Sequence, residues 1–231
     1  VDEFFSKDPI VLQNRTDTQT YLNDIKTIKQ NIIDGNVYEL NYCQEFFAKE
    51  VELNPSALFK SLNKKNPSPF AAYYNTSEIQ ICCSSPERFL RKENSRIISQ
   101  PIKGTSKRGS NEIDDLKLKT DLVDSIKNRA ENVMITDLVR NDLARCCKTG
   151  SILVEELFGV YTYPNIHQMI STISGELNIG ISFTDIIRNT FPMGSMTGAP
   201  KIEAMKLIDQ YEKSNRGFYS GSIGYLKPNG D

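Results

Sequence analysis

Residues 100–109, QPIKGTSKRG, combine side chains that could carry out chemistry on a small molecule. Lys103 ends an apolar run that includes Ile102, and it comes directly before Gly104 and Thr105. The glycine lets the backbone approach a ligand closely, and the threonine hydroxyl can hydrogen-bond to that ligand. A lysine partly buried beside apolar side chains holds its proton less tightly, so it can act as a nucleophile or a base. On these residues alone, a solvated lysine in a surface turn is the commoner interpretation.

Two further polar residues lie close together on a predicted strand over residues 37–44. Strand alternation places Glu39 and Asn41 on one face together with Cys43, while the neighbouring tyrosines and leucine occupy the other face. This face could point to solvent, or it could line a polar pocket. The alternation is compatible with both.

Other candidates depend on the ends of predicted helices and strands. Glu131 lies near the start of a predicted helix, one turn after Asn128. Residues 191–201 end in small residues and Pro200, which predicts a helix start whose free N–H groups could bind a carboxylate or phosphate. This segment is not a Walker loop, because Gly-Lys-Ser/Thr is absent. The single histidine, His167, precedes a predicted strand, and a lone histidine is usually structural.

The composition is that of a soluble globular domain. The 231 residues include 39% hydrophobic and 25% charged side chains, with a formal net charge of −1. This balance gives no overall positive field for nucleic acid or an anionic membrane. The sequence shows no apolar run of membrane-spanning length and no leader, so we expect a cytoplasmic protein. Its five cysteines form no CxxC pattern and are expected to pack as free thiols.

Periodicity and turn signals predict strands interrupted by helices. Helices are expected over residues 17–34, 54–62 and 182–189, after residue 200, and as two helices between residues 111 and 148. Strands are expected over residues 70–74, 79–83, 152–161, 168–177 and 217–226, with two more leading into residues 100–109. No repeat, linker or low-complexity tract is evident.

Taken together, several long blocks resemble the chorismate-utilising enzymes, which include anthranilate, aminodeoxychorismate, isochorismate and salicylate synthases. The matching blocks are residues 35–41, 66–70, 85–89, 101–109, 131–142, 167–171, 191–201 and 216–225. Lys103 resembles the aminodeoxychorismate branch, because anthranilate synthases usually carry alanine at this position. Asn41 is also more similar to that branch. Isochorismate-type members carry a lysine at the position of Glu39, which disfavours that activity.

The resemblance implies a reaction in which ammonia replaces the C4 hydroxyl of chorismate. Lys103 would attack C2 and form a covalent adduct, and Glu87 would be the general acid for the leaving hydroxyl. Glu131 would bind Mg²⁺ together with a second acid later in the family's fold. A separate glutamine amidotransferase subunit would deliver the ammonia. The implied substrate-binding residues are Glu39, Asn41, Gly104, Thr105, His167, Ser195, Thr197, Gly198 and Tyr219.

The implied fold is α+β, with two large antiparallel β-sheets packed together, helices on the outside and the active site between the sheets. Residues 1–231 would form one chorismate-binding catalytic domain that begins after the family's N-terminal portion and stops before its last segment. The sequence departs from the family at Glu39, commonly glutamine in amino-transferring members, and at Asn128, often an acid. The alternatives are an anthranilate synthase component I and a catalytically silent chorismate-binding fragment.

Overall fold

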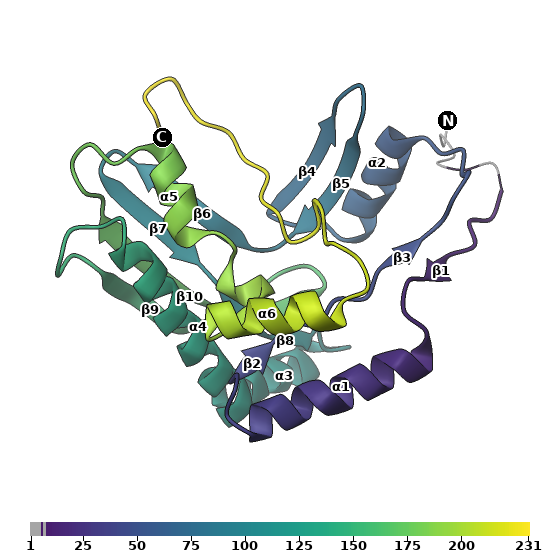
Figure 1. The fold of residues 1–231 in the computed structure, drawn as a ribbon, viewed down its shortest axis with the longest axis horizontal. Coiled ribbons are helices and arrows are strands. Elements are labelled where there is room, and N and C mark those ends of the chain that lie inside the picture. The colour runs from purple at the N-terminus through teal and green to yellow at the C-terminus, as the bar shows by residue number, and fades with distance from the viewer. Residues whose placement is uncertain (1–5, 7) are drawn as a thin grey trace.

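The largest sheet has five antiparallel strands (Figure 1). The computed structural model describes residue 6 and residues 8–231. The sheet consists of β6 (Arg88–Glu93), β7 (Arg96–Gln100), β8 (Ile102–Lys107), β9 (Leu153–Thr162) and β10 (Ile166–Glu176). β10 pairs with β9, and it also pairs with β7 and β8, which follow one another along the chain. β6 pairs with β7. Strand β10 is therefore the one to which most of the sheet is attached.

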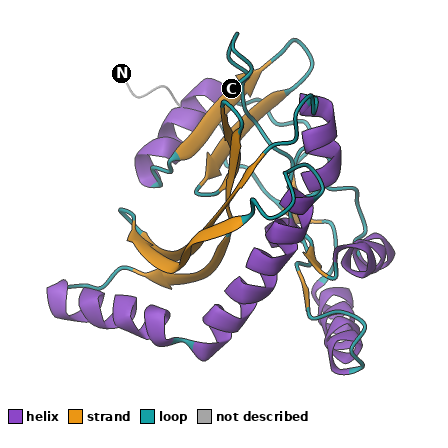
Figure 2. Ribbon diagram, turned by 90° about the vertical axis from the view of Figure 1, so that its left-hand side faces the viewer, coloured by secondary structure: helices purple, strands orange, loops and turns teal. Residues whose placement is uncertain are grey.

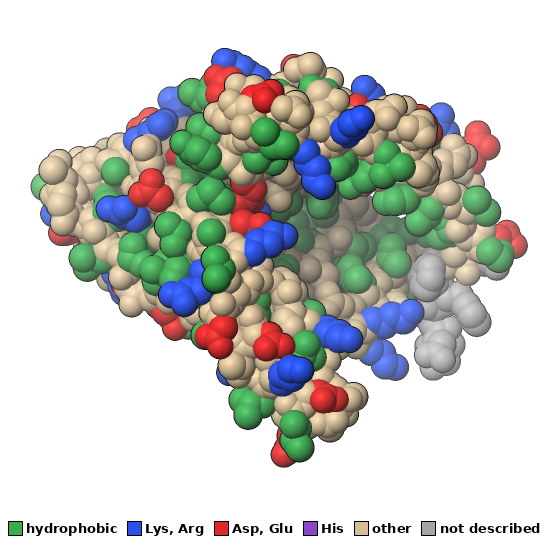
Figure 3. All heavy atoms as spheres, turned by 90° about the horizontal axis from the view of Figure 1, so that it is seen from below, with side chains coloured by type: hydrophobic (Ala, Val, Ile, Leu, Met, Phe, Trp, Pro, Cys, Tyr) green, Lys and Arg blue, Asp and Glu red, His purple; other side chains and the backbone are tan. Residues whose placement is uncertain are grey.

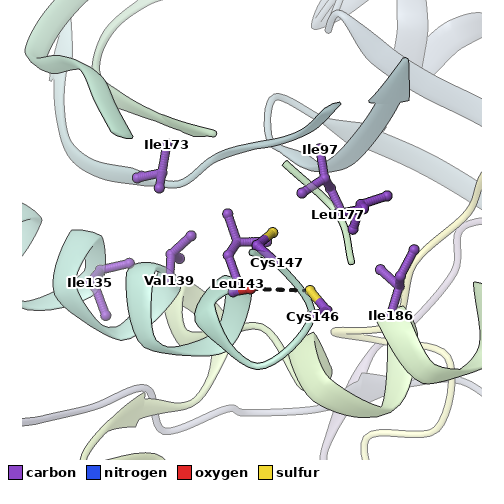
Figure 4. Packing of buried hydrophobic residues seen from close by; sticks show 9 residues of the cluster. All are labelled: Ile97, Ile135, Val139, Leu143, Cys146, Cys147, Ile173, Leu177 and Ile186. Carbon is purple, nitrogen blue, oxygen red and sulfur yellow. Dashed lines mark hydrogen bonds between the residues drawn. The ribbon is translucent and has the colours of Figure 1, made fainter. Parts of the chain in front are cut away.

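Helix α4 (Ile126–Ala144) packs against this sheet and follows α3 (Glu112–Asp124) directly. Ser125 separates the two helices, and its hydroxyl accepts a hydrogen bond from the Asn128 amide, as a serine N-cap does. Figure 4 shows the apolar side chains of α4 pointing at those of β7 and β10. The buried cluster consists of Ile97, Ile135, Val139, Leu143, Cys146, Cys147, Ile173, Leu177 and Ile186. Two of the cysteines thus pack in the core, as expected for free thiols.

The remaining elements form smaller units around the sheet (Figure 2). Antiparallel pairs join β1 (Gln13–Asn14) to β3 (Phe46–Phe47), β2 (Glu39–Leu40) to β11 (Gly198–Ala199), and β4 (Phe70–Asn75) to β5 (Gln80–Ser85). The other helices are α1 (Thr18–Ile33), α2 (Pro55–Lys65), α5 (Phe183–Thr190), the 3₁₀ turn η1 (Gly194–Met196) and α6 (Lys201–Tyr211). On the face in Figure 3, acidic and basic side chains are interspersed and the surface is hollowed.

The α+β class with antiparallel sheets is confirmed. Among the described residues one sheet is large and the other three are two-stranded. The predicted strand over residues 217–226 is wrong: these residues form turns and irregular backbone. Within the described part of the chain no strand pairs with them, and a strand is stable only when its backbone groups find partners. No helix in that part is long and apolar enough to cross a membrane.

Candidate active site

A β-bulge in β8 presents Lys103. Ile102 pairs with Ile170 and Thr105 pairs with Gln168, so Lys103 and Gly104 together oppose the single residue Met169. Such a bulge bends the strand and redirects its side chains. Gly104 has a φ of +101°, which favours glycine.

Gly104 also allows close packing at the bulge. A Cβ atom on this residue would lie 3.1 Å from the Cβ of Asn128 on α4 and 3.2 Å from the Cβ of Met169 on β10. The glycine is therefore needed for the fit of helix, bulge and neighbouring strand. The sequence predicts a glycine that approaches a ligand, whereas the close approach seen here is to the protein's own helix.

Lys103 meets two side chains from the segment around β2. Its ammonium forms an ion pair with Glu39, and the two side chains are only 14% and 13% exposed. Lys103 Nζ also donates to Asn41 Oδ1 over 3.3 Å. Of the two alternatives for the face that carries Glu39 and Asn41, the structure therefore favours the polar pocket over the solvent-facing strand.

The backbone around β2 is fixed by β11 and the residues before it. The Tyr38 N–H donates to the Ala199 carbonyl over 2.7 Å, and the Asn41 N–H donates to the Thr197 carbonyl over 2.9 Å. Gly198, with a φ of +148°, lies so close to β2 that a Cβ atom would be 2.2 Å from the Glu39 carbonyl oxygen. Glycine at this position therefore sets the separation of the two short strands.

Glu87 lies between β5 and β6 and joins the same cluster. Its carboxylate accepts a hydrogen bond from the Ser195 hydroxyl on η1. Burial raises the pKa of Glu87 from its usual 4.5 to about 7, although the Ser195 hydrogen bond and the Lys103 charge both act to lower it. The Asn41 side chain donates to the Ser195 carbonyl over 3.0 Å. A buried acid, a lysine, a second acid and two polar side chains are thus brought together.

Asn132, a buried residue of α4, binds the backbone of the bulge through its side-chain amide. Its Nδ2 atom donates to the carbonyls of Lys103 and Met169 over 3.3 and 3.4 Å, and its Oδ1 atom accepts from the Ser171 hydroxyl. This role of Asn132 was not predicted from the sequence. The sequence did contain a signal: Asn132 lies one helical turn before Ile135 and Thr136, on the face of the helix that is buried.

A buried ion pair holds the loops on the other side of the cluster. Arg216 pairs with Glu212, and its guanidinium donates to the Asn41 carbonyl over 2.7 Å and to the Met196 carbonyl over 2.6 Å. The Glu212 carboxylate also accepts from the Cys43 N–H. This pair links the segment after β2 to η1. Neither residue had been assigned a role from the sequence.

His167 lies apart from the lysine cluster in its hydrogen bonding. Its buried ring contacts Asp115 through Nε2 over 2.9 Å and the Thr162 hydroxyl through Nδ1 over 3.0 Å. Asp115 also accepts from Arg108 and from the Gly109 N–H, which hold its carboxyl pKa far below the usual value. The two ring nitrogens are thus occupied by protein partners.

Three other predicted substrate-binding residues are dispersed. Thr105 is exposed on β8, and the Thr197 hydroxyl donates to the Met193 carbonyl over 3.0 Å. Tyr219 is 62% exposed and borders an open hollow of about 510 Å³ that Asn41 also lines. The structure does not bring these three side chains to Lys103 by any hydrogen bond among the described residues.

Glu131 lies on α4 between Asn128 and Asn132, both of which contact the bulge. Its side chain is 30% exposed and pairs with Lys127 over 3.7 Å. Asn128, at a position where the family often has an acid, carries a neutral amide that donates to the Ser125 hydroxyl. It therefore offers no carboxylate to a metal. The part of the chain described by the structure contains no group of three metal-binding side chains. These residues alone therefore do not fit a protein-built Mg²⁺ site.

Sequence and structure comparisons give similar relatives. The chain is 44% identical over 215 residues to the chloroplastic aminodeoxychorismate synthase of Arabidopsis thaliana, covering 92% of this chain and 23% of that protein. It is 39% identical over 207 residues to anthranilate synthase component 1 of Aquifex aeolicus, covering 90% of this chain and 42% of that protein. The chain thus spans less than half the length of these two relatives.

The solved structure of anthranilate synthase component I from Streptococcus pneumoniae superposes with a TM-score of 0.88 at 30% identity. That match covers 99% of this chain and 50% of the other. The family model described as chorismate binding enzyme matches residues 3–231. The chain therefore belongs to the chorismate-binding enzymes.

Proposed function

We propose that this chain is the catalytic part of an aminodeoxychorismate synthase component I. It would convert chorismate and ammonia to 4-amino-4-deoxychorismate, a precursor of 4-aminobenzoate and folate, through a covalent adduct on Lys103. The observation that carries the proposal is that Lys103 and the buried acid Glu87 lie in one cluster, with the lysine charge acting on that acid. The similarity to the Arabidopsis aminodeoxychorismate synthase supports it.

The first half of the reaction uses the lysine and the acid together. The neutral Lys103 amine forms a bond to C2 of chorismate, the ring double bond shifts, and the bond from C4 to its hydroxyl oxygen breaks. Glu87 gives its proton to the departing oxygen, which leaves as water. A carboxyl with a pKa of about 7 still carries a proton in a large share of molecules at neutral pH, as a general acid must.

The second half releases the lysine. Ammonia forms a bond to C4, the double bond shifts back, and the bond from C2 to the Lys103 nitrogen breaks. The new ammonium group returns one proton to Glu87, which restores the acid. We propose that a glutamine amidotransferase subunit supplies the ammonia. The word "component" in the names of the Aquifex and Streptococcus relatives fits an enzyme with more than one part.

We also propose that Glu131 is a ligand of Mg²⁺. That residue supplies one partly exposed carboxylate on α4, whereas Mg²⁺ commonly needs further carboxylates, substrate oxygens or water. Because the described residues do not form a metal site by themselves, the steps above depend only on side chains of this chain.

An anthranilate synthase is the alternative that a specific observation favours. The Aquifex and Streptococcus relatives are named anthranilate synthases at 39% and 30% identity. Lys103 argues against this activity, since anthranilate synthases usually carry alanine there. A catalytically silent chorismate-binding protein is the other alternative.

Product analysis separates these functions. The intact protein is incubated with chorismate, Mg²⁺ and ammonium, and the products are separated by chromatography. We expect 4-amino-4-deoxychorismate. Anthranilate as the main product would support the alternative enzyme, and chorismate binding without turnover would support the silent protein. Either result would contradict the proposal.

Lys103 is tested separately by mass spectrometry. Without ammonia, the intact protein should gain the mass of one dehydrated chorismate, and Lys103→Ala should abolish that gain and strongly slow product formation. Lys103→Arg should not rescue, because a guanidinium stays protonated. Lys107→Ala, which changes an exposed lysine on the same strand, is the matched control. If Lys103→Ala formed product as fast as the unsubstituted protein, the assignment of Lys103 as the nucleophile would be refuted.

A further inference from the structure

A protonated lysine has no free lone pair, so it must lose a proton before it can attack carbon. The proposed function leaves open which group removes that proton. We propose that Glu39 is the base that takes this proton from Lys103. The inference rests on the proposed function, because it assigns a catalytic role within the Lys103 reaction. It also gives a reason for a carboxylate at a position where the resemblance leads one to expect glutamine.

The geometry of Glu39 suits proton transfer. Its carboxylate contacts the Lys103 ammonium directly, and both side chains are mostly shielded from water. Neither carboxylate oxygen of Glu39 accepts a hydrogen bond of regular geometry from the described residues. The carboxylate therefore keeps lone pairs free to bind a proton, unlike Glu87, which already accepts from Ser195.

The position of Glu39 is set by the backbone and does not depend on its own side chain. The strand pair β2–β11, the Tyr38 and Asn41 N–H groups and the close approach of Gly198 fix its Cα. Asn41 holds the other side of the ammonium through Oδ1. The backbone around β2 and the Asn41 side chain thus hold the Lys103 ammonium against the Glu39 carboxylate. An efficient base requires such preorganised geometry.

The electrostatics favour transfer when substrate excludes water. Before transfer the pair is an ammonium and a carboxylate, and afterwards it is an amine and a carboxylic acid, so its net charge stays zero. Removing two opposite charges from water is costly unless other groups compensate, and a neutral pair avoids that cost. A neutral Glu39 also removes the repulsion between its carboxylate and the two carboxylates of chorismate.

The protons balance over the whole cycle. Glu39 takes one proton from Lys103, and the freed amine bonds to C2 while Glu87 protonates the leaving hydroxyl. After ammonia attacks C4, Lys103 leaves as a neutral amine and recovers its proton from Glu39. Glu87 is reprotonated by the new ammonium group. The two acids therefore have separate tasks.

The test measures how fast the Lys103 adduct forms, by rapid quenching without ammonia followed by intact-protein mass spectrometry across a range of pH. With Glu39 present, the rate should show a plateau that extends up to about neutral pH, and it should fall above pH 7 as Glu87 loses the proton that it gives to the leaving hydroxyl. A free lysine amine, with a pKa of about 10.4, is neutral in about one molecule in a thousand near pH 7.4. Glu39→Gln should therefore slow adduct formation at neutral pH by about a hundredfold to a thousandfold, and below pH 7 its rate should rise about tenfold per pH unit in place of the plateau.

Other ionisable groups are controlled in the same measurement. Glu87 faces Lys103 and is unchanged in the variant. The Arg216 guanidinium binds the Asn41 carbonyl and, among the described residues, makes no hydrogen bond to the Lys103 side chain. Glu176→Gln removes the acid from an exposed ion pair with Lys148 and should leave the rate unchanged. If Glu39→Gln fails to fold, Glu39→Asp keeps a carboxylate and should retain the neutral plateau at a lower rate.

Different results would overturn the role of Lys103 and the role of Glu39. If the unsubstituted protein forms no Lys103 adduct, the proposed function loses its nucleophile and Glu39 loses its task. If the adduct forms and Glu39→Gln keeps both the rate and the neutral plateau, the lysine nucleophile stands and the assignment of Glu39 as its base is overturned.

Discussion

Replacing Glu87 with glutamine should stabilise the folded protein above about pH 7 and change its stability little near pH 4. Burial raises the pKa of Glu87 from 4.5 to about 7. Between these values the folded state binds a proton that the unfolded state does not, so stability falls as pH rises through this range. A difference of one in pKa corresponds to about 1.4 kcal/mol, which gives a loss of about 3 kcal/mol above pH 7.

Glutamine stays neutral at every pH, and its carbonyl can still accept from the Ser195 hydroxyl, so the variant escapes this loss. Urea unfolding of both proteins at intervals between about pH 4 and pH 8.5 gives the difference in free energy of unfolding directly. In a chain of this size, about 3 kcal/mol corresponds to a rise in Tm of roughly 6–12 °C. A difference that does not change with pH would refute the raised pKa. The same substitution should slow the reaction because it removes the general acid.

Three further substitutions test the support of the bulge and the metal. Asn132→Ala should lower the free energy of unfolding in urea by about 2–4 kcal/mol, because it leaves a cavity and unpaired buried groups. The control Asn141→Ala, at an exposed position of the same helix, should lower it by less than about 0.5 kcal/mol. Equal losses would contradict the role of Asn132. Gly104→Ala should cost roughly 1–3 kcal/mol and slow adduct formation, since the new Cβ meets α4 and β10. Glu131→Ala should weaken Mg²⁺-dependent chorismate binding in calorimetry with little loss of stability, and unchanged affinity would contradict its assignment to the metal.

The sequence predicted most of the elements because their signals are local. The cap at Asp17, the first-turn proline Pro55 and the serine cap before α5 all lie where the structure places helix starts. The strand predicted over residues 37–44 covers only Glu39–Leu40, yet Glu39 and Asn41 both contact Lys103, as a shared face requires. What alternation could not supply was the group that this face meets, because that group comes from β8.

The parts that could not be predicted depend on contacts between distant segments. The burial that raises the pKa of Glu87 exists only after η1 packs against it, and the sequence separates Glu87 from Ser195 by 108 positions. Asn132 resembles any polar residue of a helix until the bulge lies above it. Residues 217–226 have the composition of a strand, yet composition cannot supply a neighbouring strand.

The short pair β2–β11 gives the candidate site a stability separate from that of the five-stranded sheet. Only two residues of each strand hold Glu39 beside Lys103, whereas β10 is paired over most of its length. Local opening of β2–β11 would separate the base from the nucleophile while the core cluster stayed intact, and such openings require less free energy than global unfolding. A ligand that contacts both segments would shift this equilibrium toward the closed state as its concentration rises. Amide hydrogen exchange at Tyr38 and Asn41 should therefore slow when chorismate binds, while exchange in β10 stays unchanged.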